Sequence, residues 1–150
     1  MAEVPLLVPD ASAILRHVFP HRALNRQANE MVADYQAGRV NLLAPFHFSI
    51  EVSSGIRRAV AKRELRHEQA RELFLGFLAN RIPLTDAPGL TETAFENCQR
   101  YSISMRDSLY VTLAQFYQAP LVTADENLLR AIARFPYKLF LSDYESPPRR

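Results

Sequence analysis

Short apolar runs alternate along this chain with longer stretches in which apolar residues recur every three or four positions. The first run, residues 4–8, is too brief for a buried helix and predicts a strand. The longer stretches have the spacing of amphipathic helices. In chain order, the pattern predicts strands at 4–8, 40–44, 82–85, 120–124 and 137–141, and helices at 11–19, 22–37, 46–62, 67–80, 88–101, 104–117 and 126–134.

The alternation of strands and helices predicts one α/β domain over residues 1–145, with a short central parallel sheet flanked by helices. Gly38 is expected to stop the second helix, and Pro45 to end the second strand. Pro83 marks its strand as an edge strand, because proline cannot donate to a neighbour. Residues 146–150 are predicted to form a disordered tail.

Composition excludes several classes of protein. The 150 residues are 48% apolar, which is typical of a globular domain and not of a disordered or fibrous chain. No apolar run approaches the roughly 20 residues that a membrane helix needs, and the N-terminus lacks the pattern of a signal peptide. A lone cysteine, Cys98, is expected to be a small core residue. These features predict a cytoplasmic protein without membrane association.

The basic residues are distributed unevenly, although the net charge is only +2. Sixteen of the 18 are arginine, whose planar guanidinium suits phosphate. Five fall within ten positions, namely Arg57, Arg58, Lys62, Arg63 and Arg66. This cluster is compatible with binding of a phosphate-rich ligand and also with a solvated helix face, which is what charge runs on helices usually form.

Four acidic residues stand out in this pattern, and two of them occupy positions where ligands bind in α/β folds. Asp10 and Asp125 each follow a predicted strand, and the carboxyl ends of neighbouring parallel strands share one edge of a sheet. Asp107 lies in the first turn of a helix. Glu51 flanks an apolar helical stripe and has no basic partner three or four residues further on. The alternative is that the aspartates cap helices, with Ser104 and Asp107 forming a capping box.

Carboxylates gathered in one pocket repel each other, and a divalent cation is the usual way to keep them ionised together. Oxygen ligands select hard cations such as Mg²⁺ or Mn²⁺. The sequence has no Cys/His set with zinc spacing, no Gly-rich phosphate loop and no Gly-x-Ser-x-Gly motif. Any chemistry would therefore depend on the acids.

Four local features occur in order with the expected elements between them. They are Asp10-Ala11-Ser12 after the first strand, Pro45 followed by Glu51 in a helix, Asp107-Ser108-Leu109-Tyr110 opening another helix, and Thr123-Ala124-Asp125 after a late strand. Over residues 4–142 this order resembles the PIN domain, the fold of metal-dependent ribonucleases that include the toxins of VapBC-type toxin–antitoxin pairs. The resemblance implies a three-layer α/β/α fold.

By this resemblance, the metal-binding and catalytic residues are Asp10, Glu51, Asp107 and Asp125, supported by the hydroxyls of Ser12 and Thr123. Asn127, close to Asp125 in sequence, is a candidate for orienting water or phosphate. Pro9 departs from the family, which more often has an aliphatic residue there. The presence of all four acids favours an active enzyme over a degenerate PIN fold.

The resemblance further implies a Mg²⁺- or Mn²⁺-dependent endoribonuclease that cleaves RNA, with single-stranded RNA the favoured substrate. It implies a homodimer and a cognate antitoxin whose C-terminal segment covers the acidic pocket. Candidates for such surfaces are Met31, Tyr35, Phe46 and Ile56, although core packing explains them equally well.

Two other interpretations compete with this one. A phosphoryl-accepting receiver domain would need a second acid beside Asp10 and a lysine after a late strand; the first is absent, and Lys138 falls inside a predicted strand. A non-catalytic module with the PIN fold, which binds RNA or protein, would lack metal-dependent turnover. Among the histidines, only His47 lies near a proposed site residue, one turn before Glu51.

Overall fold

Strand β1 (Leu6–Pro9) is the centre of a parallel sheet. It pairs with β2 (Asn41–Leu42) on one side and with β5 (Leu121–Thr123) on the other, and β6 (Lys138–Phe140) lies beyond β5. The computed structural model describes residues 3–86 and 89–149 of the chain. The adjacency of β1 and β5 confirms that the two strand ends followed by Asp10 and Asp125 share one edge of the sheet.

A second, two-stranded parallel sheet is formed by β3 (Ala44–Pro45) and β4 (Leu84–Thr85). Pro45 is the last strand residue before the turn that leads into the next helix, as predicted, but the predicted strand 40–44 is divided between β2 and β3. The segment changes partner at Leu43, whose amide donates to Leu7, while the next amide, of Ala44, donates to Pro83. Pro45 is tolerated since the hydrogen bonds of this short segment come from its neighbours. Strand β4 lies at the edge of its sheet, as predicted.

Seven α-helices connect and cover the strands in the described part of the chain, and most begin or end within three residues of their predicted bounds. They are α1 (Ala11–Val18), α2 (Asn25–Gln36), α3 (Phe48–Ala61), α4 (His67–Ala79), α5 (Leu90–Tyr101), α6 (Met105–Tyr117) and α7 (Glu126–Ala131), followed by a short 3-10 helix, η1 (Leu141–Asp143). Pro88, the predicted start of the fifth helix, lies outside the described residues.

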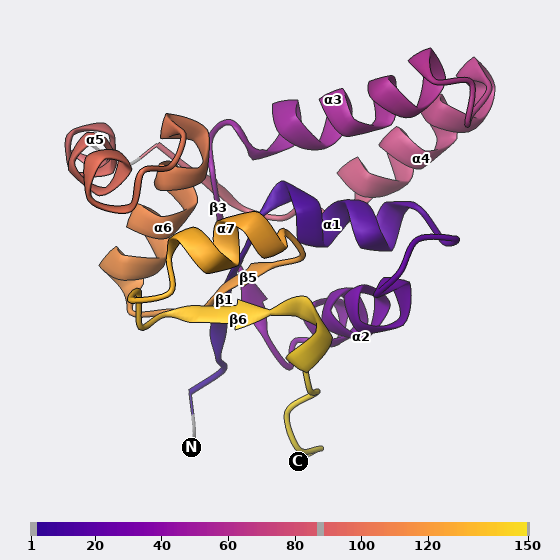
Figure 1. The fold of residues 1–150 in the computed structure, drawn as a ribbon. Coiled ribbons are helices and arrows are strands. Elements are labelled where there is room, and N and C mark those ends of the chain that lie inside the picture. Colours follow the sequence, from indigo (N-terminus) through magenta and orange to yellow (C-terminus); the bar gives the residue numbers. More distant parts are fainter. Residues whose placement is uncertain (1–2, 87–88, 150) are drawn as a thin grey trace.

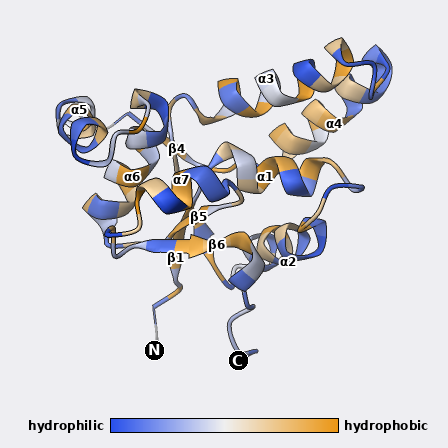
Figure 2. Cartoon of the chain, in the orientation of Figure 1, coloured by the Kyte–Doolittle hydropathy of each residue, from blue (hydrophilic) through white to orange (hydrophobic). Residues whose placement is uncertain are grey.

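Helices lie on both sides of the central sheet, which confirms the predicted α/β class (Figure 1). Helices α5 and α6 occupy one side, and α1 and α2 the other. Helices α3 and α4 form an antiparallel arm that extends past the sheet above α1. Hydrophobic residues concentrate where the helices meet the sheet and one another, while the outer faces are mostly hydrophilic (Figure 2). None of the described helices is long and apolar enough to cross a membrane.

Burial corrects several predictions about individual side chains. Met31 and Ile56, candidates for a partner surface, are 0% and 4% exposed and belong to the core, whereas Phe46 is 47% exposed. The apolar spacing of residues 88–101 predicts that Phe95 points inward, but on α5 this side chain is 58% exposed. The buried position is taken by Asn97, because its side-chain amide donates to Thr112 and Gln115 of α6.

The C-terminal segment returns to the amino end of the sheet after η1. Buried Tyr144 donates a hydrogen bond of 2.6 Å from its hydroxyl to buried Asp34 at the end of α2. Residues 146–149 belong to no helix or strand, and Arg150 lies outside the described residues. The disorder of this tail and the domain boundary at residue 145 stay predictions.

Candidate active site

Asp10 lies where β1 ends and α1 begins, and it is only 5% exposed. Its Oδ1 accepts hydrogen bonds from the Ala13 amide at 2.9 Å and from Ser12 Oγ at 2.6 Å. Its Oδ2 accepts one from Thr123 Oγ1 at 2.6 Å. Asp10 therefore does cap α1. Capping alone does not explain why each of its carboxylate oxygens also accepts a hydrogen bond from a hydroxyl.

Burial raises the pKa of Asp10 to about 6, from an ordinary value of 3.8. The hydrogen bonds from Ser12, Thr123 and Ala13 oppose this shift because they stabilise the carboxylate, and the charge of Asp107 adds to it. A buried acid whose pKa is raised this far, and which lies near a like charge, is typical of a functional site.

Asp125 stands two residues after β5 and caps α7, where its Oδ1 accepts the amides of Asn127 and Leu128 at 2.9 and 3.1 Å. Two hydroxyls tie this strand end to that of Asp10. Ser12 Oγ accepts the Ala124 amide at 2.9 Å, and Thr123 Oγ1 accepts the Asp125 amide at 3.0 Å. The loops that carry the two aspartates are therefore held in register by side chains that also contact Asp10.

Asp107 lies half-buried in the first turn of α6, and Ser104 is the residue that caps this helix, accepting the Asp107 amide at 3.1 Å. Burial raises the pKa of the Asp107 carboxyl, and the negative charges of Glu51 and Asp125 raise it further, against the opposing effects of Ser104 and Arg106. Asp107 thus experiences the charge of all three other acids, because it also acts on Asp10. The four acids form one electrostatic cluster.

Glu51 is in the first turn of α3, with its side chain 20% exposed. The positions three and four residues further on hold no basic partner, as the sequence indicates, and the partners of Glu51 precede it or lie elsewhere in the chain. Glu51 Oε1 accepts from the Tyr110 hydroxyl at 2.7 Å and lies 3.2 Å from His47 Nε2, while Oε2 is 3.9 Å from Arg106 Nε. Burial would raise the pKa of Glu51, but His47, Tyr110 and Arg106 outweigh it and lower the pKa.

The chemistry of the cluster fits a hydrated hard cation. Over residues 3–86 and 89–149, no three acidic, histidine or cysteine side chains converge closely enough to hold one ion directly. Mg²⁺, however, keeps several waters and is commonly bound through only one or two carboxylates. Mutually repelling carboxylates at the carboxyl edge of a parallel sheet suit such an ion or Mn²⁺.

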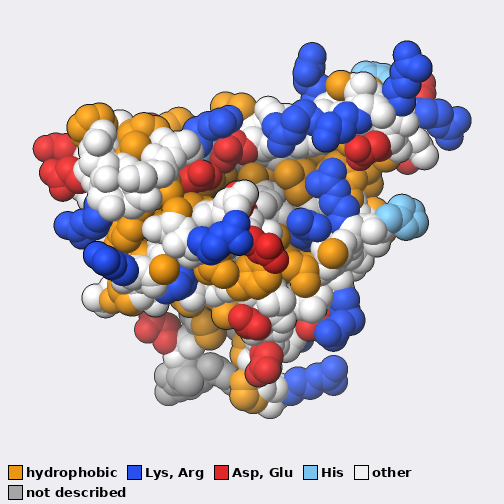
Figure 3. Space-filling view, in the orientation of Figure 1, with side chains coloured by type: hydrophobic (Ala, Val, Ile, Leu, Met, Phe, Trp, Pro, Cys, Tyr) orange, Lys and Arg blue, Asp and Glu red, His pale blue; other side chains and the backbone are white. Residues whose placement is uncertain are grey.

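An open pocket of about 670 Å³ adjoins this edge of the sheet. Three predicted site residues, Ser12, Asp125 and Asn127, line it together with Arg16 and Phe140. Figure 3 shows acidic side chains between α7 and the start of α3, and lysine and arginine side chains over α3 and the far end of the α3–α4 arm. The acidic cluster is thus accessible from one face of the molecule.

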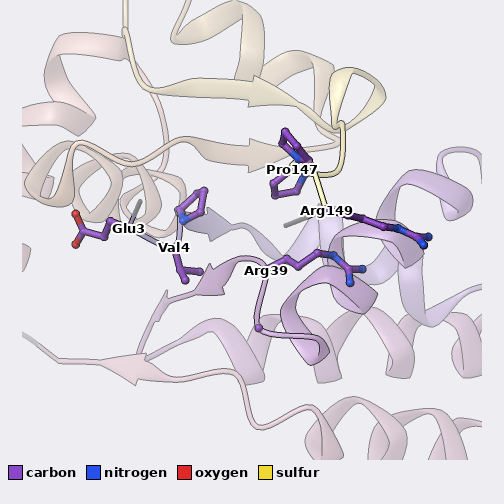
Figure 4. A pocket seen from close by; sticks show the side chains of 8 residues that line it. Glu3, Val4, Arg39, Pro147 and Arg149 are labelled. Carbon is purple, nitrogen blue, oxygen red and sulfur yellow. The ribbon is translucent and has the colours of Figure 1, made fainter. Parts of the chain in front are cut away.

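A second cavity, of about 640 Å³, lies at the opposite end of β1 (Figure 4). Residues 3–5, Pro147 and Arg149 line it, along with Arg39. The Arg39 guanidinium is already engaged by Asp34, with Nε 2.7 Å from Oδ1. None of the four acids lines this cavity, so its volume does not mark it as the candidate site.

Two groups of predicted residues lie at the margin of the site. The basic cluster Arg57, Arg58, Lys62, Arg63 and Arg66 is exposed at the end of α3 and in the turn to α4, beginning roughly 9 Å along the helix from Glu51. Asn127 is exposed, and its side-chain oxygen accepts a hydrogen bond from Arg130. The structure therefore brings the four acids, Ser12 and Thr123 together. It leaves the basic cluster and Asn127 at the margin of the site.

Two residues at the site were not predicted as functional, Tyr110 and His47. Tyr110 was noted only as part of the motif that opens with Asp107, and its hydroxyl reaches an acid 59 positions earlier in the chain. The available signal was a tyrosine on the inward stripe of a helix, where a buried hydroxyl needs a partner. For His47, the signal was its position one turn before Glu51.

Comparison with known proteins identifies relatives of both sequence and fold. The family model described as "PIN domain" matches residues 7–134. Ribonuclease VapC1 of Mycobacterium tuberculosis is 37% identical over 91 residues, which cover 59% of this chain and 65% of VapC1. The aligned chain thus spans just under two thirds of the length of that relative.

Two solved structures have a similar fold. PAE2754 from Pyrobaculum aerophilum superposes with a TM-score of 0.65 and 18% identity, over 93% of this chain and 92% of that one. A chain of a toxin–antitoxin complex from Klebsiella pneumoniae gives a TM-score of 0.63 and 16% identity, over 93% and 98%. At these identities the likeness concerns the fold alone.

Proposed function

This chain belongs to the PIN-domain family, and on that premise we propose that it is a Mg²⁺- or Mn²⁺-dependent endoribonuclease, the toxin of a VapBC-type toxin–antitoxin pair. The observation that carries the proposal is the electrostatic cluster of Asp10, Glu51, Asp107 and Asp125 at the carboxyl edge of the sheet. The similarity to ribonuclease VapC1 supports the choice of RNA as substrate.

The site residues have distinct proposed roles. Asp10, Glu51 and Asp107 hold the first ion, in part through its bound waters because no three described side chains converge closely enough to ligate one ion directly, and Asp125 completes the site or assists a second. Ser12 and Thr123 orient the Asp10 carboxylate through their hydroxyls, and both also contact the loop that carries Asp125. Asn127, on the wall of the adjoining pocket, orients water or phosphate. A bound divalent ion would supply an activated water and neutralise charge at the scissile phosphate.

The substrate is proposed to be single-stranded RNA, whose bases can turn away from the backbone. The exposed cluster Arg57, Arg58, Lys62, Arg63 and Arg66 continues from the acidic site along α3. Basic side chains beside a site that repels phosphate would guide the RNA backbone toward it. Such contacts are independent of sequence and weaken with salt.

Incubation of the purified protein with end-labelled single-stranded RNA tests the proposal. We expect cleavage with Mg²⁺ or Mn²⁺, none with EDTA, and slower cleavage as the salt concentration rises, since phosphate contacts release counterions. A duplex of the same sequence, as the matched substrate, should be cut more slowly. Absence of both cleavage and metal binding, the latter measured by calorimetry, would contradict the proposal.

That negative outcome would favour the second candidate, a non-catalytic PIN-fold module that binds RNA or protein. The observation in its favour is that no three ligands converge on one point in the described residues. Binding of RNA without turnover, unchanged by EDTA, would identify it. The cytoplasm is the proposed location for either function, in keeping with a chain that has a single cysteine.

We propose two protein partners, a second copy of the chain and a cognate antitoxin. The fold it shares with a chain of the Klebsiella toxin–antitoxin complex supports the antitoxin. Exposed apolar side chains next to the acidic cluster, Phe46 and Ile50 at 47% and 65%, are suitable contact residues. Light scattering at micromolar concentration should give twice the 17.1 kDa chain mass; the mass of a single chain would contradict the homodimer.

A further inference from the structure

The Glu51 carboxylate is held by side chains from two separate helices. Tyr110, on α6, donates its hydroxyl proton to Oε1 at 2.7 Å. His47, in the residue before α3, places Nε2 3.2 Å from the same oxygen. The same His47 nitrogen lies 3.1 Å from the backbone carbonyl oxygen of Arg106, directly before Asp107. Both neighbours of Nε2 are acceptors, so this nitrogen carries the proton.

The hydrogen bond from its hydroxyl to Glu51 is what distinguishes Tyr110 from a phenylalanine at the same position. The residue is 1% exposed, and within the described part of the chain its hydroxyl donates to Glu51 and to no other group. Its ring packs against Phe48 and His47, with centroids 6.4 and 4.8 Å away. A phenylalanine would make the same ring contacts without bringing a polar atom into the core. The specific contribution of the tyrosine is therefore the hydrogen bond to Glu51.

His47 is similarly constrained. The residue is 7% exposed, and its Nδ1 is buried without a hydrogen-bond partner among the described residues. A buried unpaired nitrogen destabilises a protein, so His47 is not explained by packing alone. All of its hydrogen bonding is directed through Nε2 to the start of α3 and to the start of α6.

The two contacts connect the helices that carry Glu51 and Asp107. Tyr110 lies one turn after Asp107 on α6, and the His47 contact to Arg106 lies one residue before it. The charge of Glu51 repels Asp107, so without restraint the two carboxylates would move apart. Tyr110 and His47 oppose that movement by fixing Glu51 relative to the first turn of α6.

We propose that Tyr110, assisted by His47, is a positioning residue that presets the Glu51 carboxylate for binding of the divalent cation beside Asp107. The inference rests on the proposed function, since it concerns the same site. In metal sites, residues that orient a ligand carboxylate typically contribute about 10- to 100-fold to metal affinity.

Calorimetric titration of Mn²⁺ into the wild-type protein and the Tyr110→Phe variant tests the proposal. We expect the variant to bind Mn²⁺ about 10- to 100-fold more weakly, while the melting temperature of the metal-free protein falls by no more than about 2–4 °C, the effect of losing one hydrogen bond. Cleavage of RNA should recover when Mn²⁺ is raised above the new dissociation constant. Tyr117→Phe, at an exposed position on the same helix, is the matched control and should bind Mn²⁺ like the wild type.

A second measurement separates positioning from a structural role. In a Glu51→Gln background, Tyr110→Phe should weaken Mn²⁺ binding no further, because the carboxylate that it orients is gone. The proposal is wrong if Tyr110→Phe lowers the melting temperature while Mn²⁺ affinity stays at the wild-type value, or if its effect persists unchanged in the Glu51→Gln background. If the wild-type protein itself binds no Mn²⁺, the proposed function fails and this proposal fails with it.

Discussion

The Asp10→Asn variant is expected to stay folded, to become more stable than the wild type without metal at neutral pH, and to lose cleavage of RNA by more than about 100-fold. That factor is the upper end of the effect of losing a residue that only orients a ligand, and Asp10 is proposed as a ligand itself. The fold should persist because asparagine can accept from the Ala13 amide and donate to the Thr123 hydroxyl, so the cap of α1 is kept.

The stability gain follows from the sign of the Asp10 pKa shift. Its pKa is about 6 in the folded protein and ordinarily 3.8, so between these values the folded state binds more protons than the unfolded state. The free energy of unfolding therefore falls as pH rises through this window, by up to roughly 3 kcal/mol once Asp10 is fully ionised. Asparagine does not ionise and escapes this loss.

Denaturant unfolding of metal-free wild-type and Asp10→Asn proteins between pH 4 and 8 measures the difference. The two should be similar near pH 4 and should diverge as pH rises to about 6, with the variant the more stable and the difference roughly constant at higher pH. Asp143→Asn, at an exposed acid on η1, is the matched control and should follow the wild type. A variant that is less stable than the wild type at pH 8, or one that retains cleavage, would show that Asp10 is a structural cap.

Local sequence patterns explain which parts of the site were predictable. Asp10 and Asp125 could be located because each follows a short apolar strand directly, a local pattern that also fixes their position at the carboxyl edge of the sheet. The position of Asp107 in the first turn of α6 was predictable from the Ser104 cap three residues earlier, although that pattern taken alone also fits a capping role. In each case the informative residues are neighbours in sequence.

What escaped prediction depends on contacts between distant segments. The partner of Glu51 was sought along its own helix toward the C-terminus, whereas Tyr110 is 59 residues away and His47 precedes it. Apolar periodicity placed Phe95 inside and overlooked Asn97, because periodicity does not register that a buried amide can be satisfied by two side chains of α6. Packing partners, not local propensity, decided these positions.

Asp34 is a third residue whose environment depends on contacts between distant segments. Its substitution has the largest expected effect on stability. The residue is 1% exposed near the end of α2, three positions after buried Met31, so it lies on the inward face of the helix. An acid at that position needs partners. Arg39 supplies two, with Nε at 2.7 Å and Nη2 at 2.5 Å from Oδ1, and the Tyr144 hydroxyl donates to Oδ2 at 2.6 Å.

The Asp34→Ala variant is expected to lose about 2–4 kcal/mol of stability, because it leaves the buried Tyr144 hydroxyl without its acceptor and removes charge-assisted hydrogen bonds. Arg39 contributes less to this loss, since at 38% exposure its guanidinium can return to water. For a chain of this length the melting temperature should fall by roughly 5–12 °C. Tyr144→Phe removes one hydrogen bond and should cost about 1 kcal/mol.

The pH dependence has the opposite sign to that of Asp10. Burial alone would raise the pKa of Asp34, but the hydrogen bonds from Tyr144, Ser146 and Arg39 outweigh it and lower the pKa below its ordinary value. The stabilisation by Asp34 is therefore complete above its unfolded pKa and is lost as pH falls through the folded value. Asp34→Asn should remove this acid sensitivity.

Thermal unfolding of Asp34→Ala, Tyr144→Phe and the double variant completes the test, with Asp143→Ala as the exposed control. Because Asp34 and Tyr144 are in direct contact, the double variant should be more stable than the sum of the two losses predicts. Cleavage well below the melting temperature should be unchanged, since Arg39, which Asp34 binds, lines the cavity at the amino end of β1, opposite to the acidic cluster. Loss of cleavage in a folded Asp34→Ala protein would instead mean that contacts at the amino end of the sheet affect catalysis at the acidic cluster.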